Sequence, residues 1–347
     1  MQYKGRNRWI FLGLVILLLL FFIANLGMGS VMLPWKQVLA ALFHFSHVEE
    51  GSTVWVIVNA YRLPQAVTAL STGILLSMSG LVLQTLFRNP LAGPSVLGIS
   101  SGASLGVAVV LLSGSVLGSR FSPTPVGGDF TVIMAAFAGA LLVLAVILFV
   151  SSRVSHVVTV LIIGIMLGYV VSAVVSVLQF FSGSEDLHAY VLWGLGSFSK
   201  TTISQSLLLL GSSVAGAVVL AFFVQPLNAL LLGERYARSV GFHPIRIQRS
   251  LILLTGLFIA LGTAFTGPIA FLGLAVPHLA RNLFKTSRQG LLLPATVLLG
   301  AVLALFCNLA AKLPGYDVSL PINVVTSLVG APVIILVIMK NRHLKTE

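Results

Sequence analysis

Charged residues are scarce in this sequence of 347 residues. They make up 8% of the chain, against roughly 25% in an ordinary soluble domain. Only 8 residues are acidic, and none of them lies near the centre of a long apolar run. Ion-coupled transporters hold charged or polar ligands for protons or sodium inside the membrane. The absence of such acids therefore argues against a secondary transporter.

Cysteine occurs once, at Cys307, which excludes an intrachain disulfide and a metal cluster built on cysteine. Cys307 lies in an apolar run and is interpreted as a small buried residue. The metalloprotease motif His-Glu-x-x-His and the phosphate-binding motif Gly-x-x-x-x-Gly-Lys-Ser/Thr are both missing. We therefore expect a protein that is not an enzyme, holds no metal or cofactor of its own and does not hydrolyse ATP itself.

Hydrophobic residues, in contrast, make up 57% of the chain, and no polar linker divides it. This composition predicts one all-α polytopic membrane domain over residues 1–347. A helix needs about 20 apolar residues to cross the hydrocarbon core. An amphipathic stretch at Leu187–Phe198 predicts one further short helix. The ten runs that fit a span are Trp9–Met28, Leu63–Phe87, Val96–Leu112, Thr131–Val150, Val157–Phe180, Ile203–Val224, Ile247–Thr266, Ile269–Phe284, Leu291–Ala311 and Ile322–Lys340.

The basic residues predict the orientation of these spans. Ten spans place both termini on one side, and with that side in the cytoplasm 15 of the 20 Lys and Arg residues fall inside. Lys4, Arg6 and Arg8 precede the first run, which lacks a clear small-x-small cleavage site and is expected to remain as a helix. The net charge of +12 lies in short patches without interleaved aromatics, so the expected partner is the lipid bilayer and not nucleic acid.

Prolines and glycines interrupt the second and third runs. Arg62-Leu63-Pro64 opens one span, and Asn89-Pro90-Leu91-Ala92-Gly93-Pro94 separates it from the next. These residue types stop one helix and start another in a tight turn, which is predicted to face the cytoplasm. On composition alone, an ordinary loop of proline and glycine is an equal alternative.

The segment Leu227–Arg249 is too polar to span the membrane and too apolar for a plain loop. It predicts a pair of short helices on the inner face, with Glu234 near a helix start, where negative charge is stabilising. Ala237 and Gly241 are four residues apart and predict a small-residue face that a partner can approach. The alternative is an interfacial helix whose arginines reach lipid headgroups.

A third segment, Thr266–Arg281, contains Gly267-Pro268 and Gly273, which echo Gly93-Pro94 and Gly98. Short echoes at corresponding positions of two halves are typical of transporters built from inverted repeats. The spacing of the two copies differs by one residue, so the echo suggests a repeat without defining its boundaries.

Taken together, the sequence resembles the permease family of type II ABC importers, which move ferric siderophores, haem or cobalamin. The resemblance runs from Arg62 to Pro332. It is carried by four motifs: Arg62-Leu63-Pro64, Asn89-Pro90-Leu91-Ala92, Leu272-Gly273-Leu274 with Pro277-His278, and Leu320-Pro321-Ile322 with Val324-Val325-Thr326.

This resemblance implies a type II permease fold in a bacterial plasma (inner) membrane, with a second permease copy or a close homologue beside a central path. It also implies two cytoplasmic ATPase subunits, which bind ATP and magnesium, and an extracytoplasmic substrate-binding protein. The segment 227–249 would couple the permease to the ATPases. The coupling residues implied are Gly233, Glu234, Arg235, Ala237, Arg238 and Gly241.

The same resemblance implies a cytoplasmic gate at Asn89 and Leu91, with Val157 on the facing side in a more apolar local sequence than some relatives have. It implies docking of the binding protein through Arg62 and Lys312. A second docking arginine of the family is replaced here by Gln65, which weakens that expectation.

Three further positions bear on the resemblance. Ser319 and Ile334 also depart from the family pattern, without consequence for the expected fold. His278 is interpreted as structural rather than as a haem ligand, because its Pro-His pair occurs in the family whatever the cargo. The choice among ferric siderophore, haem and cobalamin stays open.

Overall fold

The computed structural model describes residues 2–29, 31–43, 51–112, 128–154, 157–312 and 319–343. Every regular element within these ranges is a helix, which confirms the all-α prediction. The elements are α1 (Gln2–Gly27), α2 (Trp35–Phe43), α3 (Thr53–Val56), the π-helical turn η1 (Ile57–Arg62), α4 (Leu63–Leu86), the 3-10 turn η2 (Pro94–Leu97), α5 (Ile99–Leu112), α7 (Gly128–Arg153), α8 (Val157–Phe181), α9 (Ser184–Gly194), α10 (Ile203–Phe222), α11 (Val224–Leu232), α12 (Glu234–Ser239), α13 (Pro244–Thr266), α14 (Leu272–Phe284), α15 (Gln289–Ala311) and α16 (Ile322–His343).

Each of the ten predicted spans contains one of these helices. Among the described residues, seven helices are long and apolar enough to cross a membrane, and α5 and α16 offer shorter apolar stretches. The ten-span count is therefore approximate, since α5 and α14 are only 14 and 13 residues long. The short helix predicted at Leu187–Phe198 is α9.

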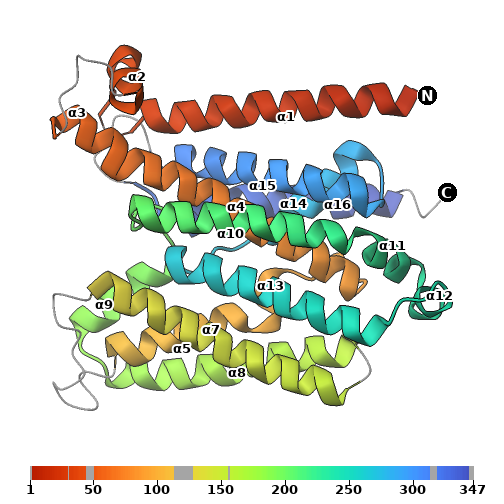
Figure 1. Cartoon of the computed structure of the whole chain (residues 1–347). Coiled ribbons are helices and arrows are strands. Elements are labelled where there is room, and N and C mark those ends of the chain that lie inside the picture. Colours follow the sequence, from red (N-terminus) through yellow and green to blue (C-terminus); the bar gives the residue numbers. More distant parts are fainter. Residues whose placement is uncertain are drawn as a thin grey trace.

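The long helices lie side by side as one bundle with two distinct ends (Figure 1). One end carries α12, together with the start of α1 and the end of α16, and is called the α12 end below. The opposite end carries α2, α3 and α9 and is called the α9 end. The predicted coupling segment and the predicted docking residues thus belong to opposite ends of the bundle.

Helix α4 is the centre of the bundle. The most apolar stretch of this helix is 94% buried, whereas the most apolar stretch of α8, which faces outward, is 17% buried. Glycines allow its neighbours to approach the backbone: a Cβ on Gly73 would lie 2.3 Å from the Gly300 carbonyl oxygen of α15. Small residues at such contacts are the usual basis of close helix packing in membranes. The buried hydroxyls of Ser71, Ser79 and Thr85 donate to carbonyls of α4 itself, and Thr85 also accepts from Gln289 Nε2 of α15 at 2.9 Å.

Two of the helices, α5 and α14, begin inside the bundle after an irregular segment. The segment 87–98 leads from α4 into α5, and the segment 267–271 leads from α13 into α14. The two segments line one cavity. Directly after the second break, Gly273 of α14 lies against the first break: a Cβ on Gly273 would lie 2.4 Å from Pro94 Cγ and 2.7 Å from the carbonyl oxygen of Leu76, halfway along α4. The two short echoes in the sequence therefore mark equivalent breaks, called the first break (87–98) and the second break (267–271) below.

The second break ends at Phe271, a non-glycine residue with φ of 65° that lies directly before α14. Positive φ is an outlier for a bulky side chain and persists only where the surroundings fix it. Here α16 fixes the conformation of Phe271. Gly330 of α16 has no side chain, and the Phe271 side chain packs directly against it. Irregular backbone within a bundle of this kind is tolerated where it lines a cavity, as this segment does.

Candidate coupling and gating site

The coupling segment folds as two short helices at the α12 end (Figure 1). Gly233, with φ of 123°, ends α11, and Glu234 is the first residue of α12, as predicted from its charge. Gly241, with φ of 88°, then turns the chain toward α13. Gln248 Nε2 of α13 donates to Glu234 Oε1 at 3.1 Å, which fixes the start of α12 against the long helix.

The outer surface of α12 is charged. Arg235 and Arg238 are exposed, and Arg238 lies 4.0 Å from Glu234 one turn earlier. Such an exposed pair contributes little to stability, so both guanidinium groups stay accessible. Ala237 differs: it is fully buried, and its carbonyl accepts from the Phe242 backbone. The sequence predicts that Ala237 and Gly241 form a bare face for a partner. This prediction is wrong for Ala237, because Ala237 lies on the side of α12 that packs against the rest of the protein.

Arg88 joins the coupling segment to the first break. Its Nη2 donates to the Leu230 carbonyl oxygen, 3.1 Å away, near the end of α11. A Cβ on Gly233 would lie 3.9 Å from the same nitrogen. The carbonyls at a helix end lack partners within the helix and bind cations favourably. The bond therefore links the joint between α11 and α12 directly to the start of the first break.

A cavity of about 390 Å³ lies at this contact and is lined by residues of four segments. It brings the predicted gate residue Val157 together with Glu234 of the coupling segment, beside Arg88 and Gln248. The residues directly before Val157, Ser155 and His156, lie outside the described part of the chain. The structure places the two segments that the sequence singled out around one space.

The other predicted gate residues form a tight turn beyond Arg88. Asn89 Oδ1 accepts from the Leu91 backbone N–H at 2.9 Å, the side-chain bond that makes asparagine a turn residue. Leu91 is 51% exposed, so an apolar side chain projects from the turn. His278 Nε2 lies 2.7 Å from the Pro90 carbonyl oxygen and donates to it, since a carbonyl can only accept. This buried bond supports the structural interpretation of His278.

Sequence reasoning assigned no role to Arg88, Gln248 or Gln84. Gln84 Nε2 donates to the Leu274 carbonyl at 3.2 Å, and Arg281 donates to Gln84 Oε1, so α4 and α14 are joined beside the turn. For Arg88, the one available signal was that a basic residue stands next to the predicted gate. The partners of Gln84 and Gln248 come from distant parts of the chain, which no local pattern indicates.

At the α9 end, Arg62 is 6% exposed and its guanidinium is fully engaged. Its Nη1 donates to the carbonyls of Leu26 and Gly27 at 2.9 and 2.7 Å, and its Nη2 donates to the Val31 carbonyl. The π-helical turn η1 ends at Arg62 and sets the direction of the side chain. Arg62 therefore caps the end of α1, where cations stabilise the unpaired carbonyls.

Lys312 makes a second cap on the same helix end. It is 8% exposed, and its Nζ donates to the Asn25 carbonyl at 2.8 Å. Asn308 Nδ2 donates to Asn25 Oδ1 at 2.7 Å, so a buried polar cluster ties α1 to α15. Docking through Arg62 and Lys312 stays a prediction, and it would require both side chains to leave the end of α1.

Across the described residues, no three His, Cys, Asp or Glu side chains gather as a metal site would require. Cys307 is fully buried in α15, in agreement with its interpretation as a small core residue.

A bundle of long apolar helices, with two broken helices inside it and a charged helical segment at one end, is the architecture of a membrane transport protein. The FecCD transport family matches residues 17–340, and this chain belongs to that family. Family membership makes it a permease component rather than an enzyme, and confirms the resemblance drawn from the four motifs.

Individual relatives match over nearly the whole chain. The vitamin B12 import system permease protein BtuC of Klebsiella pneumoniae is 34% identical over 350 residues, covering 99% of this chain and 96% of the relative. A Helicobacter pylori protein named a probable iron chelatin transport system permease protein is 33% identical over 310 residues, covering 89% of this chain and 90% of the relative. Among solved structures, a candidate metal-chelate type ABC transporter in an inward-facing conformation has a TM-score of 0.82 at 29% identity, covering 96% of this chain and 99% of that one.

Proposed function

We propose that this chain is the permease subunit of an ATP-driven importer for a bulky metal chelate, in the class of iron chelates, haem or cobalamin. It forms the path together with a second permease copy or a close homologue. Its relatives include permeases named for vitamin B12 and for iron chelatin, which define this cargo class without choosing within it.

One observation carries the proposal: the contact of Arg88 with the Leu230 carbonyl, which connects the segment 227–249 to the gate turn. A lipid-anchoring amphipathic helix would need no bond to the first break. A segment that converts the movement of a separate ATPase into movement of the gate does need one. Exposed Arg235 and Arg238 supply charge for the ATPase, and Gly233 and Gly241 provide the turns that present α12.

We infer from the charge distribution that the α12 end faces the cytoplasm of a bacterial inner membrane. The arginines of α12 and the start of α13 gather there, as do the start of α1 and the end of α16 (Figure 1). Basic segments stay preferentially on the cytoplasmic side. Both termini are then cytoplasmic, and the α9 end meets the extracytoplasmic binding protein.

Reconstituted transport tests this assignment. The permease is placed in liposomes with its cognate ATPase inside and its binding protein outside, and uptake of a ferric siderophore, haem or cobalamin is followed with ATP and with an ion gradient. We expect uptake with ATP alone. Uptake that follows the ion gradient without ATP would show a secondary transporter instead.

Charge reversal on α12 tests the coupling site in the same liposomes. The double variant Arg235→Glu, Arg238→Glu should lose at least about tenfold of its stimulated ATP hydrolysis, since repulsion replaces attraction at the contact. Arg153→Glu is the matched control, an exposed arginine at the end of α7 that belongs to neither segment. Equal losses in the two variants would mean that the coupling surface lies elsewhere.

A further inference from the structure

Asn323, in the first turn of α16, joins three separate segments at the α9 end of the second break. Its Oδ1 accepts from the Ala270 backbone N–H at 2.9 Å. Its Nδ2 donates to the carbonyls of Gly194 and Pro268 at 3.1 and 2.5 Å. Its own backbone N–H donates to the Leu195 carbonyl at 3.3 Å. These four bonds, called the Asn323 clasp, fasten the end of α9 and the second break to the start of α16.

The clasp depends on the chemistry of a side-chain amide. The side-chain oxygen must accept one hydrogen bond and the side-chain nitrogen must donate two, and the planar amide of asparagine provides both. An aspartate has nearly the same shape but only accepts, so it would face the carbonyls of Gly194 and Pro268 with negative charge. Shape and hydrogen bonding can therefore be separated by a single substitution.

Helix α9 packs on α5 and presents Tyr190 and Trp193 to the hydrophobic core, but most of its surface is not buried. Of its 11 residues only Trp193 is buried, so its position depends on how its ends are held. At its C-terminal end the chain makes close backbone contacts: a Cβ on Gly267 would lie 2.5 Å from the Trp193 carbonyl oxygen. The Ser197 backbone N–H donates to the Thr266 carbonyl at 2.8 Å and adds one bond to the same joint. The clasp and these contacts fix where α9 lies.

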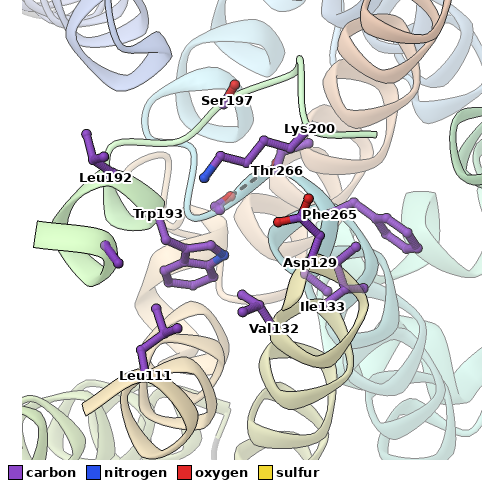
Figure 2. A pocket seen from close by; sticks show the side chains of 13 residues that line it. Leu111, Asp129, Val132, Ile133, Leu192, Trp193, Ser197, Lys200, Phe265 and Thr266 are labelled. Atoms are coloured by element: carbon purple, nitrogen blue, oxygen red, sulfur yellow. Dashed lines mark hydrogen bonds between the residues drawn. The ribbon is translucent and has the colours of Figure 1, made fainter. Parts of the chain in front are cut away.

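Two cavities lie beside the clasp. Figure 2 shows the first, a space of about 240 Å³ into which Trp193 projects, with Asp129 and Lys200 lining it. The second, of about 260 Å³, is lined by Asn323, Phe271 and Pro94 of the first break. Thr266 and Gly267 border the first cavity, and Pro268 borders the second. The second break therefore runs from the lining of the first cavity into the lining of the second.

We propose that Asn323 is a positioning residue that closes the α9 end of the path by holding α9 against the second break. This inference rests on the proposed function, because it assigns the clasp to one step of the transport cycle. While the clasp is formed, the cavity beneath α9 is shut off from the cavity beside the first break. Release of the clasp frees α9 and opens the α9 end.

The variant Asn323→Asp tests the clasp, with Asn323→Ser as a second variant that also removes the two donated bonds. Asn282→Ala is the matched control, since Asn282 is exposed on α14. A nitroxide label replaces Val191 of α9, which is 46% exposed, in a Cys307→Ala background. A second preparation carries the label at Leu207 of α10, which is 54% exposed and lies outside the clasp.

The label on Val191 should become more mobile in Asn323→Asp and Asn323→Ser, while the label on Leu207 stays unchanged. In liposomes containing ATPase and binding protein, the chelate imported per ATP hydrolysed should fall about tenfold, which corresponds to about 1.4 kcal/mol. Hydrolysis itself should continue, because α12 is untouched. Asn282→Ala should match the unmodified protein in both measurements.

Unchanged mobility at Val191 in Asn323→Asp would overturn the proposal, because shape alone would then hold α9. A parallel fall in hydrolysis and uptake would overturn it as well, since that pattern indicates general damage. Failure of the unmodified protein to import with ATP would instead refute the proposed function. The label measurement needs no transport and keeps the two failures apart.

Discussion

The two breaks have the same construction but are fastened at opposite ends of the bundle. Near the start of the first break, Arg88 binds the Leu230 carbonyl of the coupling segment, and the turn of this break is held by His278 at Pro90. The second break is held by Asn323 and lies against α9. Each short helix, α5 or α14, therefore starts from a segment tied to a different end.

This difference gives the two breaks different partners. One bond joins the first break to the coupling segment, and the clasp joins the second break to α9. Directly after the second break, Gly273 of α14 packs on Pro94 of the first break. Under the proposed function, this contact would let one end respond to the other, as alternating access requires. Substitutions at the contact between Gly273 and Pro94, at the hydrogen bonds that hold the first break and at the cap of α1 should separate these roles.

The largest effect is expected at the contact between the breaks. Gly273→Val would place Cβ 2.4 Å from Pro94 Cγ and 2.7 Å from a backbone oxygen of α4, where neither atom can yield. We expect a loss of about 3 kcal/mol or more and little folded protein. Size-exclusion profiles and thermal unfolding in detergent measure this.

The control for that variant is Gly211→Ala on α10, where no atom lies within 4 Å of an added Cβ. It should fold normally and gain up to about 1 kcal/mol, since alanine is the better helix former. If Gly273→Val folded as well as the control, the two breaks would not be in close contact.

The next largest effect is expected at the fastening of the first break. Arg88→Gln removes the charged donor from the Leu230 carbonyl, a bond of about 1.5–3 kcal/mol. ATP hydrolysis should continue while uptake per ATP falls about tenfold. Arg153→Gln, at an exposed site of the same end, should leave the ratio unchanged. A normal ratio of uptake to ATP hydrolysis in Arg88→Gln would contradict the proposed link between the coupling segment and the gate.

Much of this arrangement could be predicted from the sequence because it depends on local sequence patterns. Long apolar runs set the order of the helices, and Gly-Pro pairs marked both breaks. The burial of Ala237 could not be predicted, since α12 has only six residues and too few turns for a periodic pattern. The capping role of Arg62 depends on carbonyls 35 and 36 residues away, and Asn323 binds Gly194, which is 129 residues away. Such contacts arise only when the bundle has formed.

A smaller effect is expected at His278, the second fastening of the first break. His278→Leu leaves the Pro90 carbonyl without its donor and should cost about 1–2 kcal/mol in thermal unfolding. His278→Gln keeps a donor and should recover part of that loss. Uptake of haem by His278→Gln should remain. Complete loss of haem uptake in a stable His278→Gln protein would point to a metal ligand rather than a structural residue.

The smallest effect is expected far from both breaks, at the cap of α1. Lys312→Met removes the bond from Nζ to the Asn25 carbonyl, and should lower stability by about 1 kcal/mol. Because Lys312 is 8% exposed, the affinity of the binding protein should not change. Lys36→Met, an exposed lysine at the same end, should leave thermal unfolding unchanged and serves as the control. A drop in binding-protein affinity without a change in unfolding would show instead that Lys312 leaves its cap to dock, and that the α9 end rearranges when its partner arrives.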